Sequence, residues 1–154
     1  MDVDAFLALC QSEMALLNTL QQTLQQEQQA ILRMDALRID TLADAKLQQL
    51  QQLSDVRSAR LALQQAAGIA APESWLPWLQ QALPEVQQQW QALELAMLRL
   101  KALNEINADL ADERMQFAGA VIDKLRSSMQ GVDGYGRHGT LSASVGGSRR
   151  LGSA

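Results

Sequence analysis

Leucine and glutamine alternate at helical spacing through much of this chain, and the pattern limits what the chain can fold into. Residues 17–26 read Leu-Asn-Thr-Leu-Gln-Gln-Thr-Leu-Gln-Gln, and 21 of the 154 residues are glutamine. Both residue types favour helix, and their spacing places an apolar stripe along an otherwise polar rod. Such a rod has to bury its stripe against other helices, so the pattern predicts an all-α bundle.

The first helix is predicted over residues 3–37, with Asp2 or Asp4 as its N-cap. Its apolar positions follow alternating steps of three and four residues, with gaps at Glu13, Glu27 and Gln28. The stripe consists of Val3, Phe6, Cys10, Leu17, Leu20, Leu24, Ile31 and Met34. This near-heptad spacing is typical of coiled-coil-like helices in a left-handed bundle.

The second helix is predicted over residues 41–67, with Asp40 as its cap after a turn near 37–40, and Gly68 suits the position after its end. Neither glycine nor proline enforces the turn, so one continuous helix is the alternative. We favour the turn because a helix over 3–67 spans roughly 100 Å with nothing to fold back on.

A stretch that contains the three prolines interrupts the long helices. A short helix is predicted over residues 74–82, where Trp75 and Trp78 are three positions apart and placed to close one end of the bundle. A ligand cage formed by the two indole rings is the alternative. Pro84 then begins the longest helix, predicted over residues 84–129.

The composition changes after residue 130. Seven of the nine glycines lie in residues 131–154, among serines and arginines. Such a segment cannot bury enough apolar surface to order itself, so we expect a flexible Gly/Ser-rich tail after a bundle domain of residues 1–130. The predicted fold is an antiparallel bundle of three long helices, with a short helix between the second and the third.

Few residues suggest catalysis. Asp109, Asp112 and Glu113 form an acidic cluster that is more simply a solvated helix face than a pair of catalytic carboxylates. The single histidine, His138, has no second histidine or nearby cysteine, so no metal site is expected. A partial glycine-loop pattern in the tail lacks a preceding strand and a following helix, so no cofactor is expected. The sequence predicts that the protein is not an enzyme.

Charge and hydropathy argue against two further classes of function. The net charge is −4, and because the tail contributes three arginines and one aspartate, residues 1–130 carry −6. This charge opposes nucleic-acid binding. No segment approaches the roughly 18 to 20 apolar residues of a membrane span, so membrane insertion is not expected. The acidic start Met1-Asp2-Val3-Asp4 is unlike a signal peptide, and a cytoplasmic location is predicted.

The length of helix 84–129 predicts an uncovered partner-binding surface. At roughly 69 Å it exceeds the roughly 50 Å and 40 Å of the two helices it packs against. Its last turns then present Leu110, Phe117, Val121 and Leu125 to a partner.

Asn104 and Asn107 are predicted on the same stripe of this helix. Asparagine on a buried stripe costs stability, but it fixes register or pairs with a partner's backbone. The alternative is a stripe that drifts, so that both asparagines face water.

Several short patterns occur in the order found in the FlgN-type flagellar export chaperones. Residues 103–110, Leu-Asn-Glu-Ile-Asn-Ala-Asp-Leu, resemble the Asn-x-x-Asn-Gly-x-Leu stretch of that family, with Ala108 in the place of glycine. Residues 135–139, Tyr-Gly-Arg-His-Gly, resemble its Tyr-x-x-x-Gly. The family's second-helix pattern is similar to Asp40, Thr41, Leu42, Lys46, Leu50, Leu53 and Arg57 or Arg60. The likeness covers essentially the whole chain.

This resemblance implies a cytoplasmic chaperone of flagellar type III secretion. Such a protein binds C-terminal helical segments of hook-associated (hook–filament junction) proteins, prevents their premature assembly and delivers them to the export apparatus. The expected partner-binding residues are Asn104, Asn107, Leu110, Arg114, Phe117, Val121 and Leu125, and Tyr135 is the expected contact to the export apparatus. A monomer or weak dimer is expected. The alternative is a homo-oligomeric structural coiled-coil protein with no client.

Overall fold

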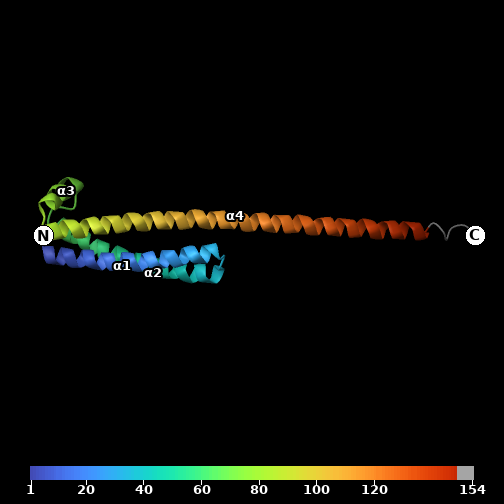
Figure 1. The fold of residues 1–154 in the computed structure, drawn as a ribbon, viewed down its shortest axis with the longest axis horizontal. Coiled ribbons are helices and arrows are strands. Elements are labelled where there is room, and N and C mark those ends of the chain that lie inside the picture. Colours follow the sequence, from blue (N-terminus) through green and yellow to red (C-terminus); the bar gives the residue numbers. More distant parts are fainter. Residues whose placement is uncertain (149–154) are drawn as a thin grey trace, which may run out of the picture. The chain divides into compact units, whose positions relative to one another are not determined.

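A computed structural model describes the backbone of residues 1–148 and the side chains of residues 1–131. The described part of the chain is helical, which confirms the predicted all-α class (Figure 1). The chain divides into two units, residues 1–111 and residues 112–154, and the division falls within the last helix. The helices are α1 (Val3–Leu32), α2 (Ala36–Ala66), α3 (Pro72–Gln81) and α4 (Pro84–Ser148).

α1 begins where the sequence predicts, because Asp2 acts as its N-cap. The Asp2 carboxylate accepts a hydrogen bond from the Ala5 backbone N–H at 3.1 Å, which satisfies one of the free donors of the first turn. α1 and α2 then pack against each other as a helical hairpin (Figure 1).

The turn between α1 and α2 lies earlier than the predicted residues 37–40. α1 ends at Leu32, and Asp35 rather than Asp40 caps α2. The Asp35 Oδ1 accepts from the Arg38 backbone N–H at 3.1 Å, whereas Asp40 lies inside α2. The expected range 3–37 for the first helix is therefore about one turn too long.

Met34 makes this early turn possible, although its side chain is unusual there. Its φ is 55°, in the left-handed region that costs a non-glycine residue roughly 1–2 kcal/mol. The turn is closed by the Met34 N–H donating to Ile31 O and the Asp35 N–H donating to Ala30 O, both at 3.0 Å. Gly68, with φ 71°, ends α2 with the same hydrogen-bond pattern and without the steric cost.

Aromatic side chains close one end of the unit formed by residues 1–111. α3 begins at Pro72, two residues before the predicted start, because proline is well suited to the first helical position. Its Trp75 lies 5.6 Å from the Phe6 ring and 4.9 Å from the Trp90 ring, measured between centroids. Trp78 stacks on Trp75 at 5.0 Å. These contacts agree with the prediction that the two tryptophans close the bundle.

The hydrophobic core cluster joins α1, α3 and the first turns of α4. Its members are fully or almost fully buried: Phe6, Cys10, Leu17, Trp75, Val86, Trp90 and Leu93. α2 contributes much less to the core, because its buried side chains are Leu42, Arg60 and Gln64, two of which are polar.

α4 extends beyond its predicted end near residue 129, since its backbone is helical to Ser148. No proline follows Pro84, and each glycine costs a helix only about 1 kcal/mol relative to alanine. The expected boundary at residue 130 therefore falls inside the helix. The side chain of Tyr135 and residues 149–154 lie outside the described part of the chain.

Candidate functional site

Two glutamates occupy buried positions on the apolar stripe of α1. Glu13 and Glu27 continue the steps of three and four residues that also place Cys10, Leu17 and Leu24 in the core. Glu13 is fully buried and Glu27 is 7% exposed. A buried carboxylate is costly unless it is paired and hydrogen-bonded, so these positions require partners on the neighbouring helices.

Glu13 is paired with Arg60 of α2. The Arg60 Nε donates to Glu13 Oε2 at 2.7 Å, and the Arg60 Nη2 lies 3.4 Å from the other carboxylate oxygen. The Arg60 Nη1 donates to Gln64 Oε1 at 3.0 Å, and the guanidinium lies 4.8 Å from the centroid of the Trp90 ring. The guanidinium therefore binds the carboxylate while it lies over an aromatic ring from α4.

Glu27 joins three helices. The Lys46 Nζ of α2 donates to Glu27 Oε1 at 2.6 Å. From α4, the Asn107 Nδ2 donates to Glu27 Oε2 at 2.9 Å and to the Leu24 backbone carbonyl at 2.8 Å. Asn107 is 2% exposed, so its amide donors are used inside residues 1–111.

The two ion pairs fix the register of the α1–α2 hairpin. The glutamates are fourteen positions apart on α1, from 13 to 27, and their cations are fourteen positions apart on α2, from 46 to 60. Fourteen positions are two heptads, so the two glutamates occupy equivalent heptad positions on α1 and the two cations occupy equivalent heptad positions on α2. A shift by one heptad would leave buried charges without partners.

These ion pairs were not identified from the sequence, although the signal is present there. Glu13 and Glu27 stand as gaps in the α1 stripe, and a charge at such a position predicts an opposite charge on the facing helix. Lys46 and Arg60 belong to the second-helix pattern on which the family resemblance rests. Their spacing equals the spacing of the two glutamates on α1.

The structure places the predicted partner-binding residues in two different environments. Within residues 1–111, Asn107 is buried, Leu110 is half-buried and Asn104 is exposed. Neither alternative holds for both asparagines, since Asn107 faces the core and Asn104 faces water. In residues 112–131, Arg114 is half-buried, while Phe117, Val121 and Leu125 are exposed.

Residues 112–131 form an amphipathic part of α4. At about 100° per residue, their large apolar side chains occupy a sector of roughly 160° around the helix axis. Its large members are between 42% and 73% exposed, and we call them the exposed apolar face: Met115, Phe117, Val121, Ile122, Leu125 and Met129. Arg114 falls within the same sector. Contiguous exposed apolar surface of this kind commonly marks a protein-binding site.

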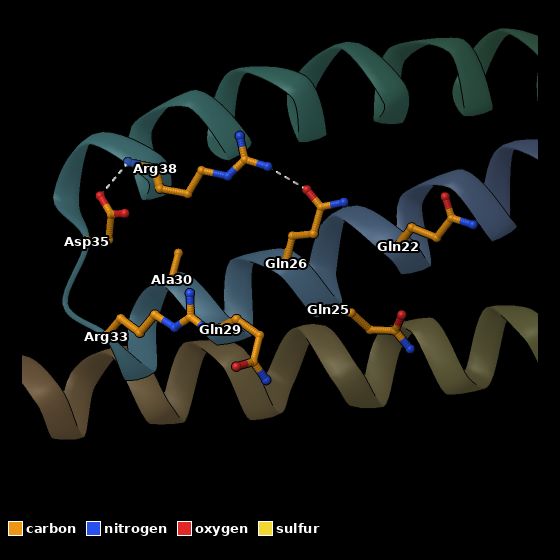
Figure 2. Close-up of a pocket in the computed structure, with 8 residues that line it drawn as sticks. All are labelled: Gln22, Gln25, Gln26, Gln29, Ala30, Arg33, Asp35 and Arg38. Carbon is orange, nitrogen blue, oxygen red and sulfur yellow. Dashed lines mark hydrogen bonds between the residues drawn. The ribbon is translucent and has the colours of Figure 1, made fainter.

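A polar hollow of about 480 Å³ lies at the α1–α2 turn. Figure 2 shows Arg38 reaching from α2 toward α1, where its Nη2 donates to Gln26 Oε1 at 2.7 Å. The remaining lining consists of Gln22, Gln25, Gln29, Ala30, Arg33 and Asp35. Four of the eight lining residues are glutamines, and no nucleophile stands beside a base there.

Neither a metal cluster nor a membrane span is found in the described residues. No group of three or more histidine, cysteine or acidic side chains among them is placed to hold a metal ion. No helix in that part of the chain is long and apolar enough to cross a membrane. The buried Cys10 is also a poor nucleophile, because burial raises its pKa to about 11.

A helical hairpin packed on a long helix with an amphipathic, uncovered segment defines a class of all-helical proteins suited to binding other proteins. The FlgN protein family model matches residues 1–143, and the chain belongs to this family. FlgN proteins are flagellar export chaperones, so the role is that of a chaperone in flagellum assembly, with flagellar proteins as clients. Searches among curated proteins and among solved structures found no match to the chain.

Proposed function

We propose that the protein binds C-terminal helical segments of hook-associated proteins in the cytoplasm, prevents their premature assembly and delivers them to the flagellar type III export apparatus. The observation that carries this proposal is the exposed apolar face of residues 112–131. Amphipathic helices pair through apolar faces with anchors at i, i+3, i+4 and i+7, and Ile122, Leu125 and Met129 of this face stand at i, i+3 and i+7. The family membership supplies the flagellar clients.

Within the proposed surface, Phe117, Val121 and Leu125 provide the apolar contact. They are four residues apart, so each is rotated by roughly 40° from the one before and the three form one ridge. Arg114 lies in the same sector and is available to a client carboxylate. Asn107 is left out of this surface, because its amide donors are already bound to Leu24 and Glu27.

A triple variant, Phe117→Ser, Val121→Ser and Leu125→Ser, tests this surface. Each change removes roughly 1 kcal/mol of apolar burial in the complex, so affinity for a purified hook-associated protein should fall roughly 100-fold, as measured by calorimetry. The matched control is Leu76→Ser, Leu83→Ser and Leu98→Ser, which alters leucines of residues 1–111 that are 56% to 65% exposed. Unchanged client affinity in the first variant, with helix content retained, would refute the proposed surface.

The homo-oligomeric alternative uses the same apolar face and is separated by light scattering. A chaperone with a free face is expected to be a monomer or weak dimer. A stable dimer at micromolar concentration that the triple variant dissociates would instead favour a structural coiled-coil protein without a client.

Tyr135 is proposed as a contact to the export apparatus, on the strength of the family resemblance alone. Tyr135→Ala is expected to leave client affinity unchanged and to lower the amount of client secreted by flagellated cells. Equal secretion by the variant and the parent would remove Tyr135 from the proposal.

A further inference from the structure

Residues 1–111 contain an apolar groove that is separate from the exposed apolar face. It opens between α2 and α4 above α1 and has a volume of about 200 Å³. We call it the α2–α4 groove. Its lining residues are Leu17, Leu20, Leu24, Lys46, Leu50, Leu53, Met97, Leu100, Lys101 and Asn104.

Each of the three helices contributes side chains over one heptad of its length. Those of α1 form the floor and are almost fully buried, at 1–2% exposed. On α2 the lining residues are at i, i+4 and i+7, from Lys46 to Leu53, and on α4 they run from Met97 to Asn104. This spacing gives the groove a length of roughly 10 Å, or two turns of helix. The walls are less buried, with Leu50 44% exposed.

The charged side chains in this lining are both cations, one on each wall. Lys46 is held by Glu27 and keeps a side-chain exposure of 26%. Lys101 is 75% exposed, and its nearest carboxylate, Glu105, is 4.0 Å away and itself 64% exposed. No carboxylate lines the groove, although the chain as a whole carries a net charge of −4.

We propose that the α2–α4 groove seats an amphipathic helix of the client, with apolar side chains at i, i+3 or i+4, and i+7, and with carboxylates on its flanks. The apolar side chains enter the groove between the walls, as a fourth helix inserts knobs into the holes of a bundle. The client carboxylates pair chiefly with Lys101, which lies at the rim. This inference rests on the proposed function and adds a second contact site, in residues 1–111.

A second copy of this chain fits the groove less well. The amphipathic segment that another copy offers, residues 112–131, carries three acidic and three basic residues, so it has no net charge. Arg114 lies within its apolar sector and would approach Lys101. Like charges brought together at an interface oppose association.

The inert cysteine permits a direct test on the full chain. Cys10 is fully buried and its pKa is raised to about 11, so a thiol-reactive fluorophore would label a cysteine introduced at the exposed Asn104 instead. The probe is a synthetic amphipathic peptide of about 18 residues with leucines at the stated spacing and flanking glutamates. A second peptide carries lysines in place of the glutamates. A label at Leu76→Cys, outside the groove, is the reference.

The glutamate peptide is expected to change the emission of the label at position 104 and not of the label at 76. The lysine peptide should bind roughly tenfold more weakly. Lys101→Glu should weaken the glutamate peptide about fivefold or more and reduce its salt dependence. Leu47→Gln, at a site 71% exposed and outside the groove, should leave binding unchanged.

Three results would overturn the groove proposal. The first is equal affinity of the chain for the glutamate and lysine peptides. The second is an affinity for the glutamate peptide that Lys101→Glu does not change. The third is an emission of the label at position 104 that changes with protein concentration and not with added peptide. The last result would assign the groove to a second copy of the chain.

Failure of this proposal is distinguishable from failure of the proposed function. The triple variant at Phe117, Val121 and Leu125 should still bind the glutamate peptide, because those residues lie outside the groove. If a hook-associated protein binds the Lys101→Glu and parent chains equally but loses the triple variant, the groove assignment fails and the chaperone function stands.

Discussion

Residues 1–111 and residues 112–131 both depart from simple hydrophobic patterning, and they do so in opposite directions. In the first region, charged side chains occupy core positions, where Glu13 is fully buried against Arg60. In the second, large apolar side chains are 42% to 73% exposed. The buried charges are tolerated because each has a partner, and they fix how the helices align. The exposed apolar side chains have no such partner in the described part of the chain, and they suit a surface that acts through another protein.

Removing one partner of the deepest ion pair should give the largest effect on stability. Arg60→Met leaves the Glu13 carboxylate buried without its cation, and the free energy of unfolding should fall by about 3–5 kcal/mol. Chemical denaturation followed by circular dichroism measures this. The double variant Glu13→Leu, Arg60→Met should recover most of the loss, because no charge is then left unpaired. A loss below about 1 kcal/mol in the single variant would contradict the account of the buried pair.

Asn107 and Asn104 test the contrast between buried and exposed polar groups within one helix. Asn107→Ala removes the two hydrogen bonds to Leu24 and Glu27, so the free energy of unfolding should fall by about 1–3 kcal/mol. Asn104→Ala, at an exposed position, should change it by no more than about 0.5 kcal/mol. Equal effects from the two substitutions would show that Asn107 does not hold α4 on α1.

Cys10 should make stability depend on alkaline pH. Burial raises its pKa in the folded chain from 9.0 to about 11, so folding favours the neutral thiol. Its contribution is complete below pH 9 and is lost as the pH rises from 9 toward 11. The difference in unfolding free energy between the parent and Cys10→Ala should be constant below that window and shrink within it. A constant difference throughout would indicate a solvated thiol.

The two phenylalanines of the chain give the sharpest comparison between a buried and an exposed apolar side chain. The exposed one is expected to give the smallest effect on stability. Phe117 is 58% exposed, so Phe117→Ala should change the free energy of unfolding by no more than about 0.5 kcal/mol. Phe6 is fully buried, and Phe6→Ala should cost about 3–5 kcal/mol. Affinity for a client is expected to fall in the Phe117→Ala variant. A large loss of stability from Phe117→Ala would mean that the exposed apolar face is covered by the chain itself.

Much of the fold could be predicted from local patterns. The three-and-four spacing of α1, the Asp2 cap and Gly68 after α2 are signals carried by a few neighbouring residues, and each predicts a helix or its end. The turn at Met34 was missed because a methionine in the left-handed region has no such signature. The end of α4 was placed too early because glycine weakens a helix without stopping it.

The candidate site was predictable only where it depends on local spacing along one helix. The spacing of Phe117, Val121 and Leu125 identifies an amphipathic helix, and their exposure agrees with the expectation of an uncovered stripe. Asn107 could not be assigned from the same spacing, because the face of α4 that packs on α1 depends on contacts made across more than eighty positions of sequence.

The sequence by itself determined that this chain is helical, that its helices are amphipathic and that it belongs among FlgN proteins, because helix propensity, heptad spacing and short motifs are local properties. Only the tertiary structure decided which charges are paired, where the hairpin turns and which polar side chain lies inside. Those outcomes depend on the alignment of helices distant in sequence, and that alignment has to bury the apolar side chains and also give each buried ion a partner.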